Sequence, residues 1–303
     1  MKAVFVDRNE CITCGGRDLK TLSKGKFTDE PLHSYLSNDP WGISPLPFID
    51  EEHWVFVQCN DCSQKFHKRI LSDEWLETYY SKWISADAIE EYHENVSGTL
   101  RFDKAKHSVE RILLIEKATR ELSKNKKVKI LDFGCGDGDF LEACRLFGFE
   151  CTGVEFSESR HQRRGIDFYP SLQDVIKDNE SNVEFDAIVM FEVLEHLPNP
   201  RKTLAELVKS LKKGGVFVIE TPNCVDVKNI LTMNDYRLIH PLGHINAFTH
   251  KTLKIIAGKV GLESFVAGTP QVSADFKRII KREARRFVER FWSTKTQIFF
   301  RKT

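Results

Sequence analysis

The feature that most constrains the fold is a glycine-rich loop directly after a short apolar run. Residues 129–131 lead into Asp132-Phe-Gly-Cys-Gly-Asp-Gly138, and a helical pattern begins near Asp139. Glycines let the backbone turn tightly and approach a ligand closely. In open α/β sheets, ligands bind at the carboxyl ends of such strands. The loop therefore predicts a nucleotide-type site at the end of a parallel strand.

The segments around this loop alternate between predicted strands and helices. Strand–helix alternation with short loops favours right-handed crossovers and a parallel sheet covered on both faces. Helices are expected at residues 103–122, 249–260 and about 274–291, with Thr249 as the cap and Gly261 as the stop of the second one. Strands are expected at residues 128–133, 150–155, 166–169, 185–191, 216–220, 262–266 and 297–301.

Acidic residues decide which nucleotide the loop suits. Glu155 follows Gly138 by seventeen residues and ends the next predicted strand, where a carboxylate can accept hydrogen bonds from both ribose hydroxyls. The glycine spacing is G-x-G-x-G rather than the G-x-G-x-x-G of dinucleotide folds. Asp132 would repel a pyrophosphate but suits a ligand with ammonium and sulfonium charges. These residues favour S-adenosylmethionine over NAD.

Three motifs resemble class I S-adenosylmethionine-dependent methyltransferases. Residues 129–138 resemble motif I, Gly153-Val-Glu-Phe156 resembles the ribose-binding motif, and residues 185–197 resemble the fourth-strand motif of the branch that includes ubiquinone-biosynthesis O-methyltransferases. The resemblance covers about residues 100–303. It implies an α/β, Rossmann-like seven-stranded sheet of order 3-2-1-4-5-7-6 with the last strand antiparallel. The expected cofactor-binding residues are Asp132, Gly134, Cys135, Gly136, Gly138, Glu155, Phe156 and Phe191.

A cluster of acidic residues and histidine follows the predicted fourth strand. Glu192, Glu195 and His196 would share one face of a helical turn, and His244 lies in a loop after the fifth strand. Two carboxylates and two imidazoles could hold Mg²⁺ or Mn²⁺, which would lower the pKa of an acceptor hydroxyl. The arrangement resembles the metal sites of ubiquinone-pathway O-methyltransferases and of small-RNA 2′-O-methyltransferases.

The same cluster can work without a metal. His196 or His244 could act as a general base with Glu195 beside it, or the site could act by positioning alone. The residues could also simply support the loop. These three interpretations stay open at the level of sequence.

Two Cys-x-x-Cys pairs mark the N-terminal region. Four thiolates suit tetrahedral Zn²⁺ in a closed structural site. The second pair lies between predicted strands at residues 54–58 and 64–70. The sequence therefore predicts a zinc-ribbon-like domain over residues 1–95 in front of a methyltransferase domain over residues 96–303. The predicted zinc ligands are Cys11, Cys14, Cys59 and Cys62.

This N-terminal arrangement resembles the zinc-binding module of sugar C-methyltransferases. Those proteins carry a third domain after the Rossmann core, which this 303-residue sequence does not show.

Short helices are also expected in the N-terminal domain, at residues 72–83 and 86–94. The turn-rich stretch at 38–48 cannot run as one helix.

Charge and hydropathy constrain the partners. The net charge of +1 points to no polyanionic partner, although residues 273–303 carry ten Lys and Arg against three Asp and Glu. The helix expected at about 274–291 lies in this basic stretch. Its basic side chains could contact phosphate groups, RNA or an anionic membrane surface, or they could form the solvated face of a helix that packs on the core. We expect reduced cysteines and a cytoplasmic location. We expect neither a signal peptide nor a transmembrane segment.

The leading hypothesis is an enzyme that methylates a hydroxyl of a small molecule or glycan. The alternatives are an RNA 2′-O-methyltransferase, a sugar C-methyltransferase and a non-catalytic cofactor-binding or zinc interaction module. Nucleic acid is the less favoured substrate, because the net charge is near zero and no aromatic-rich RNA-binding module is evident. The oligomeric state stays open.

Overall fold

The computed structural model describes residues 1–84, 98–123, 126–156, 166–178, 184–268 and 295–303. These residues form two compact units. The N-terminal unit comprises residues 1–100, 194–201 and 222–256, and the sheet unit comprises residues 101–193, 202–221 and 257–303. The helices predicted at 86–94 and 274–291 lie outside the described residues.

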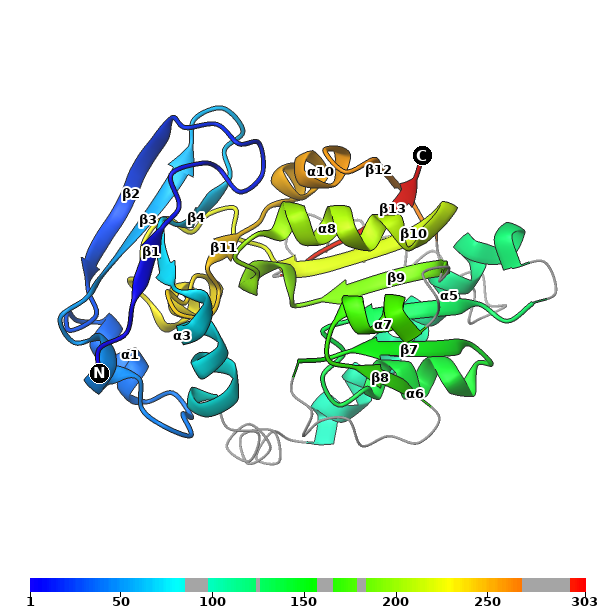
Figure 1. Ribbon diagram of the computed structural model, residues 1–303, viewed down its shortest axis with the longest axis horizontal. Helices are drawn as coiled ribbons and strands as arrows, with labels where there is room; N and C mark the ends of the chain where they lie inside the picture. Colours follow the sequence, from blue (N-terminus) through cyan, green and yellow to red (C-terminus); the bar gives the residue numbers. More distant parts are fainter. Residues whose placement is uncertain (85–97, 124–125, 157–165, 179–183, 269–294) are drawn as a thin grey trace. The chain divides into compact units, whose positions relative to one another are not determined.

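The sheet unit is built on a seven-stranded sheet (Figure 1). Its spatial order is β12-β13-β10-β9-β6-β7-β8, which is the predicted order 3-2-1-4-5-7-6 read from the other edge. Strands β6 to β10 pair in parallel, whereas β12 and β13 pair antiparallel. The predicted Rossmann-like sheet is confirmed. The strands are β6 (Lys129–Phe133), β7 (Glu150–Val154), β8 (Asp167–Tyr169), β9 (Phe185–Phe191), β10 (Leu211–Pro222), β12 (Leu262–Phe265) and β13 (Lys295–Lys302).

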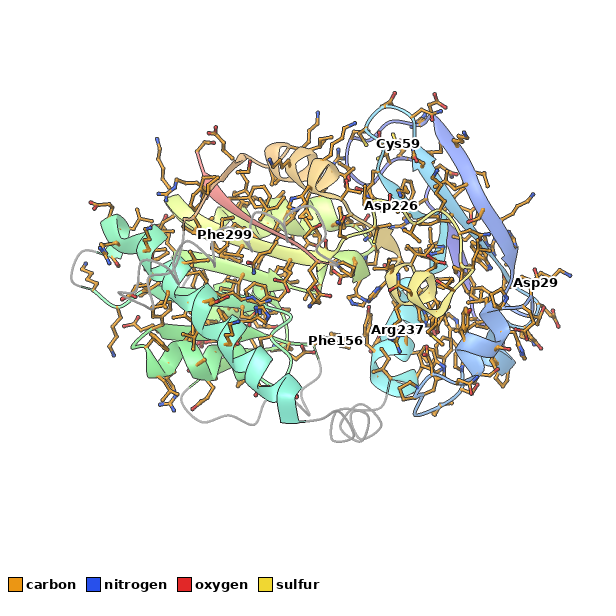
Figure 2. All side chains as sticks on the ribbon, turned by 180° about the vertical axis from the view of Figure 1, so that it is seen from behind. Asp29, Cys59, Phe156, Asp226, Arg237 and Phe299 are labelled. Carbon is orange, nitrogen blue, oxygen red and sulfur yellow. The ribbon has the colours of Figure 1, made fainter. Side chains whose placement is uncertain are left out.

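Helices cover both faces of this sheet. Figures 1 and 2 show α5 (Gly98–Ser123) on one face and α7 (Leu172–Asp178) and α8 (Pro200–Lys209) on the other. Ile112 and Ile115 of α5 belong to the same buried cluster as Ile130 of β6 and Val189 of β9. A parallel strand that is buried on both faces needs a continuous apolar run, and every residue of β9 from Phe185 to Met190 is buried.

The N-terminal unit contains a four-stranded antiparallel sheet and a two-stranded one. The larger sheet has the order β11-β4-β3-β2, and β1 pairs with β5. The segment predicted as one strand at 64–70 is two strands, because β4 pairs with β3 and β11 while β5 pairs with β1. The strands are β1 (Phe5–Asp7), β2 (Leu19–Lys26), β3 (His53–Cys59), β4 (Lys65–His67), β5 (Arg69–Leu71) and β11 (Asn246–Ala247).

An aromatic core joins distant segments of this unit. Phe27, Trp54, Trp75 and Trp83 are buried together with Cys224, Val227, Tyr236, Ile239, Leu242 and Ala247. Residues 222–247 thus complete a core that the N-terminal residues begin, although the sequence assigns them to the second domain. The helical elements are α1 (Leu32–Ser37), α2 (Leu46–Ile49), α3 (Asp73–Thr78), the π-helical turn η1 (Tyr79–Trp83), the 3₁₀ turn η3 (Leu194–His196) and α9 (Met233–Leu238).

Two caps define helix ends that matter for the sites. Thr232 and Asp235 form a reciprocal capping box that starts α9, and the helix ends at Leu238, two residues before His240. The hydroxyl of Thr249 accepts the Thr252 N–H at 3.2 Å and caps α10 (His250–Gly258), as predicted. Across the described ranges, every helix is too short or too polar to cross a membrane.

Candidate functional site

The glycine loop leaves β6 in a conformation that other residues rarely adopt. Gly134, Gly136 and Gly138 have φ angles of +78°, +53° and +77°. A Cβ on Gly134 would lie 2.4 Å from Cγ2 of Val193. The loop is tied to the next strand, because the N–H groups of Gly134 and Cys135 donate to the carbonyl of Val154 at 2.7 and 3.1 Å. Glycine is therefore required both for the turn and for the fit.

The two predicted cofactor carboxylates lie at the carboxyl ends of adjacent strands. Asp132 is in β6, and Glu155 directly follows β7. The N–H of Gly136 donates to Oε2 of Glu155 at 3.0 Å, so the loop and the ribose-binding candidate meet. This edge is where open α/β sheets bind ligands.

Asp132 is almost fully buried, with 3% of its surface exposed. Burial raises the pKa of its carboxyl to about 7 from the usual 3.8, against a smaller lowering by the Arg111 guanidinium. A buried carboxylate is costly unless a positive group compensates it. A ligand cation beside Asp132 would supply that compensation, which fits a cofactor that carries an ammonium group.

The two predicted aromatic residues lie in different surroundings. Phe156, labelled in Figure 2, directly follows Glu155 and is 57% exposed. The Phe191 ring, at the end of β9, packs edge-on against Phe140 at 5.1 Å and lies 4.2 Å from the Arg111 guanidinium carbon. Phe156 is available to a ligand, whereas Phe191 is held by its neighbours.

A charged network beside Phe191 was not predicted from the sequence. Arg111 of α5 donates to both carboxylate oxygens of Glu220 at 2.6 Å, and Gln297 donates to the same carboxylate at 2.8 Å. Glu220 is buried and lies near the end of β10. The sequence did offer one signal for Glu220, which is an acidic residue near the end of an apolar strand, where such sheets bind ligands. Its partners come from a distant helix and the last strand.

Glu192 belongs to this network and to the sheet unit. It pairs with Lys295 at 3.3 Å, and burial raises its pKa while Lys295 opposes the change. Its φ is +56°, so it does not start the expected helical turn. A non-glycine residue in this left-handed region is typical of a functional site. The metal-ligand assignment of Glu192 stays a prediction.

Glu195, His196 and His244 come together in the N-terminal unit. One ligand atom from each lies within 4.8 Å of the others, and the two imidazole rings are 4.7 Å apart. Asn246 holds η3 in place by donating to the Leu194 and Leu197 carbonyls at 3.2 and 2.7 Å. The structure thus places side by side three of the four residues that the sequence grouped.

The two histidines of this cluster are neutral at pH 7. Burial lowers the pKa of His196 to about 4, and it lowers the pKa of His244 well below its usual value. Nδ1 of His244 is buried, and no hydrogen-bond partner lies near it among the described residues. Neutral imidazoles are the form that binds metals or accepts protons. The donor set fits a divalent cation, and it fits a general base equally well.

The four predicted zinc ligands converge in the same unit. Their sulfur atoms all lie within 4.8 Å of one another, and Cys59 is labelled in Figure 2. The Cys11–Cys62 and Cys14–Cys59 sulfur pairs are 3.5 Å apart. A disulfide would need about 2.0 Å, whereas tetrahedral Zn–S bonds of about 2.3 Å separate sulfurs by about 3.8 Å. The cluster is therefore compatible with zinc.

Thiol acidity differs within the cluster. Burial raises the pKa of Cys11 to about 11 and also raises that of Cys62. For Cys14, burial acts in the same direction, but hydrogen bonds from the Gly16 N–H and the neighbouring thiols outweigh it and lower the pKa. The Gly16 N–H lies 3.4 Å from the Cys14 sulfur.

Curated relatives match part of the chain. A ubiquinone biosynthesis O-methyltransferase of Rickettsia canadensis is 29% identical over 150 residues, which are 47% of this chain and 62% of that protein. A protein with the same name from Idiomarina loihiensis is 31% identical over 137 residues, which are 42% and 55% of the two chains. The matched stretches span less than two thirds of these relatives.

A solved structure and a family model cover more of the chain. The crystal structure of the plantazolicin methyltransferase BpumL in complex with a monoazolic desmethylPZN analog and SAH aligns with a TM-score of 0.50 at 14% identity. The alignment covers 76% of this chain and 94% of that one, which shows a shared fold. Residues 100–265 match the family described as methyltransferase domain, which is more than half of the 303 residues. The chain therefore belongs to the methyltransferase domain family and has the class I, Rossmann-like fold of S-adenosylmethionine-dependent methyltransferases.

Proposed function

We propose that this chain transfers the methyl group of S-adenosylmethionine to a hydroxyl of a small molecule or glycan. The observation that carries the proposal is the cofactor cradle, which consists of the loop glycines with positive φ, the buried Asp132 and Glu155. Glu155 accepts a hydrogen bond from the Gly136 N–H at 3.0 Å. The printed names of the curated relatives, which are O-methyltransferases, and the SAH in the BpumL structure support it.

Each element of the cradle has a proposed role. Glu155 accepts hydrogen bonds from the ribose hydroxyls, and Asp132 compensates the ammonium group of the methionine portion. The backbone of Gly134, Cys135, Gly136 and Gly138 contacts the cofactor, and exposed Phe156 packs against its base. When bound, S-adenosylmethionine supplies a sulfonium methyl carbon, which an oxygen lone pair attacks while the carbon–sulfur electron pair leaves on sulfur.

The proposed proton acceptor is His196. Its Nδ1 lies 3.0 Å from the Gly243 carbonyl oxygen, which can only accept a hydrogen bond. Nδ1 therefore carries the ring proton, and Nε2 keeps a lone pair that can take the proton of an acceptor hydroxyl. Only Glu192 and Val193 separate β9 from the 3₁₀ turn that carries His196.

The same residues could hold a metal ion. Glu195, His196 and His244 would bind Mg²⁺ or Mn²⁺, and such an ion would lower the pKa of an acceptor hydroxyl. Turnover that survives exhaustive chelation supports His196 as the base. Turnover that is lost on chelation and restored by Mg²⁺ or Mn²⁺ would assign the metal role instead.

We propose that the four N-terminal cysteines hold structural Zn²⁺. The supporting observation is the approach of four sulfurs to nearly the separation of a tetrahedral site. The ion would stabilise the turn that joins the two central strands β3 and β4, because Cys59 ends β3 and Cys62 lies in that turn.

A methyl-transfer screen tests the proposed function. Metabolite, glycan and RNA pools are incubated with isotopically labelled S-adenosylmethionine, and the labelled product is located by mass spectrometry and NMR. We expect label on an oxygen of a small molecule or glycan. Label on a ribose 2′-oxygen of RNA, or on carbon, would overturn the substrate assignment.

Variants of two histidines in the same unit complete the test. His196→Ala should lower kcat about 10²- to 10⁴-fold, the usual contribution of a general base. His53→Ala is the matched control, because His53 is exposed. Equal activity of the two variants would exclude His196 from the chemistry.

A further inference from the structure

A third histidine, His240, lies in a tight turn two residues after the end of α9. Its Nδ1 accepts the N–H groups of Leu242 and Gly243 at 3.0 and 3.1 Å. The Gly243 nitrogen also lies 3.2 Å from the His240 carbonyl oxygen. A nitrogen that accepts two hydrogen bonds carries no proton, so the ring proton is on Nε2.

The other side of the His240 ring faces Asp39. Nε2 lies 3.3 Å from the Asp39 carboxylate without forming a hydrogen bond to it, and the Tyr236 hydroxyl donates to that carboxylate. The Trp41 and Tyr236 rings pack against the imidazole at centroid distances of 5.7 and 4.6 Å. His240 is thus fixed by two hydrogen bonds at Nδ1 and by aromatic contacts on its sides. It cannot serve as a free base.

The turn that His240 caps presents one carbonyl to the candidate site. The Gly243 oxygen receives Nδ1–H of His196 at 3.0 Å. Glycine is required at this position, because a Cβ there would lie 2.4 Å from the Tyr79 hydroxyl. The turn that carries the Gly243 oxygen is therefore packed closely against Tyr79 and is held by the His240 cap.

We propose that His240 is a positioning residue that fixes the tautomer of His196 through the Gly243 carbonyl. The inference rests on the proposed role of His196 and extends it to a residue of the 222–256 segment. The chain of contacts runs from Nδ1 of His240 to the N–H groups of the turn, and then from the Gly243 carbonyl to Nδ1 of His196. In an unconstrained imidazole, Nε2 would carry the proton in much of the population and could not accept one from a hydroxyl.

Asparagine at position 240 separates positioning from mere support. Its Oδ1 is attached to Cγ, as Nδ1 is in histidine, and can accept the same two backbone N–H groups. It lacks the group that reaches Asp39. Phenylalanine fills the ring volume but accepts no hydrogen bond. His240→Asn should therefore preserve the turn, whereas His240→Phe should release it.

The test reads the tautomer of His196 directly. Chelator-treated protein with ¹⁵N-labelled histidine is measured by long-range ¹H–¹⁵N NMR, which distinguishes Nδ1–H from Nε2–H. We expect Nδ1–H in the parent protein and in His240→Asn, and a mixed population in His240→Phe. Turnover of His240→Phe should fall about 10- to 100-fold with little change in KM, as when a partner of a site residue is lost, and His240→Asn should recover most of it.

Two further variants keep the proposal open to refutation. If His240→Phe does not fold, His240→Ala also removes the acceptor of the two backbone N–H groups, without added bulk, and should also raise the Nε2–H population of His196. His53→Phe serves as the control for added bulk. An unchanged His196 tautomer in folded His240→Phe or His240→Ala would overturn the proposal. Absence of methyl-transfer activity would overturn the proposed function, whereas the tautomer measurement would still test the role of His240.

Discussion

The glycine-loop site and the histidine site are assembled from the chain in opposite ways. The first takes its main residues from a single β–loop–α–β stretch between Asp132 and Glu155. The second needs Tyr79, His196 and the turn at 240–243, which are far apart in the sequence. A local site survives changes elsewhere, whereas a site built from distant segments depends on the integrity of its whole unit. Each prediction below tests this difference.

The largest effect is expected from the zinc cluster. Cys62→Ser removes one of four thiolates, and loss of the ion should destabilise the N-terminal unit by at least about 5 kcal/mol, since structural zinc contributes ~10 kcal/mol or more in small domains. Elemental analysis and thermal unfolding measure the change. Cys224→Ser is the control, because Cys224 is buried in the same unit outside the cluster.

Cys62→Ser should also distinguish the glycine-loop site from the histidine site. Methyl transfer should be lost with Cys62→Ser, while calorimetric affinity for S-adenosylmethionine should change less than about threefold. Loss of cofactor binding would show that the glycine-loop site also depends on the N-terminal unit. The comparison would then fail.

The next largest effect concerns the buried carboxylate of Asp132. Its folded-state pKa of about 7 lies above the ordinary 3.8, so folding takes up a proton between these pH values. The stability of the ligand-free protein should therefore fall as pH rises from about 4 to about 7, by up to about 4 kcal/mol. Denaturant unfolding across this range measures the slope.

Asp132→Asn should flatten that slope and weaken cofactor binding at neutral pH. Asp137→Asn is the matched control, because Asp137 is an exposed residue of the same loop. A slope that persists in Asp132→Asn assigns the pH dependence to another group.

A smaller effect is expected from the loop glycine. Gly134→Ala combines a φ of +78° with a 2.4 Å contact to Val193, which should cost about 2–3 kcal/mol, or about 100-fold in cofactor affinity. Gly148→Ala isolates the backbone term, because Gly148 has a φ of +84° with no atom within 4 Å of the added Cβ. Equal losses of stability in the two variants, measured without cofactor, would rule out the close fit as the cause.

The smallest predicted effect lies in the non-local part of the sheet unit. Arg111→Lys keeps the charge beside Glu220 but removes Nη2, which donates to both Glu220 oxygens, and this should cost about 1–2 kcal/mol of stability. Arg120→Lys, an exposed position of the same helix, should be neutral. No difference between the variants would show that the Glu220 network contributes little.

The sequence was sufficient where function depends on spacing along the chain. The glycines, Asp132 and Glu155 are recognisable because one turn and one strand separate them. The two cysteine pairs were paired correctly because thiols at Cys-x-x-Cys spacing favour one ion. By contrast, Lys295 and Gln297 contact Glu220 only because β13 inserts between β12 and β10.

The histidine site shows where the sequence was insufficient. His196 and His244 were found because they follow a motif and a loop, but nothing in the local pattern distinguishes His240 from a surface histidine. Its role depends on the turn at residues 240–243 and on His196, which precedes it by 44 residues and donates to the Gly243 carbonyl. The helical turn expected to start at Glu192 does not form there. The backbone of Glu192 has a positive φ of 56°, and the 3₁₀ turn η3 begins only at Leu194.

Strand β11 gives the order of synthesis a consequence for this protein. Strands β2, β3 and β4 leave the ribosome early, but β11 pairs with β4 only after residues 246–247 have been made. At about 5–20 residues per second, the N-terminal unit waits roughly 8 to 30 s between its first and last segments. In that interval the β4 edge and the aromatic core lack their partners, while the glycine loop and its neighbouring strands have already emerged. Nascent chains should therefore need protection from aggregation at the β4 edge and the aromatic core until residues 246–247 have been made.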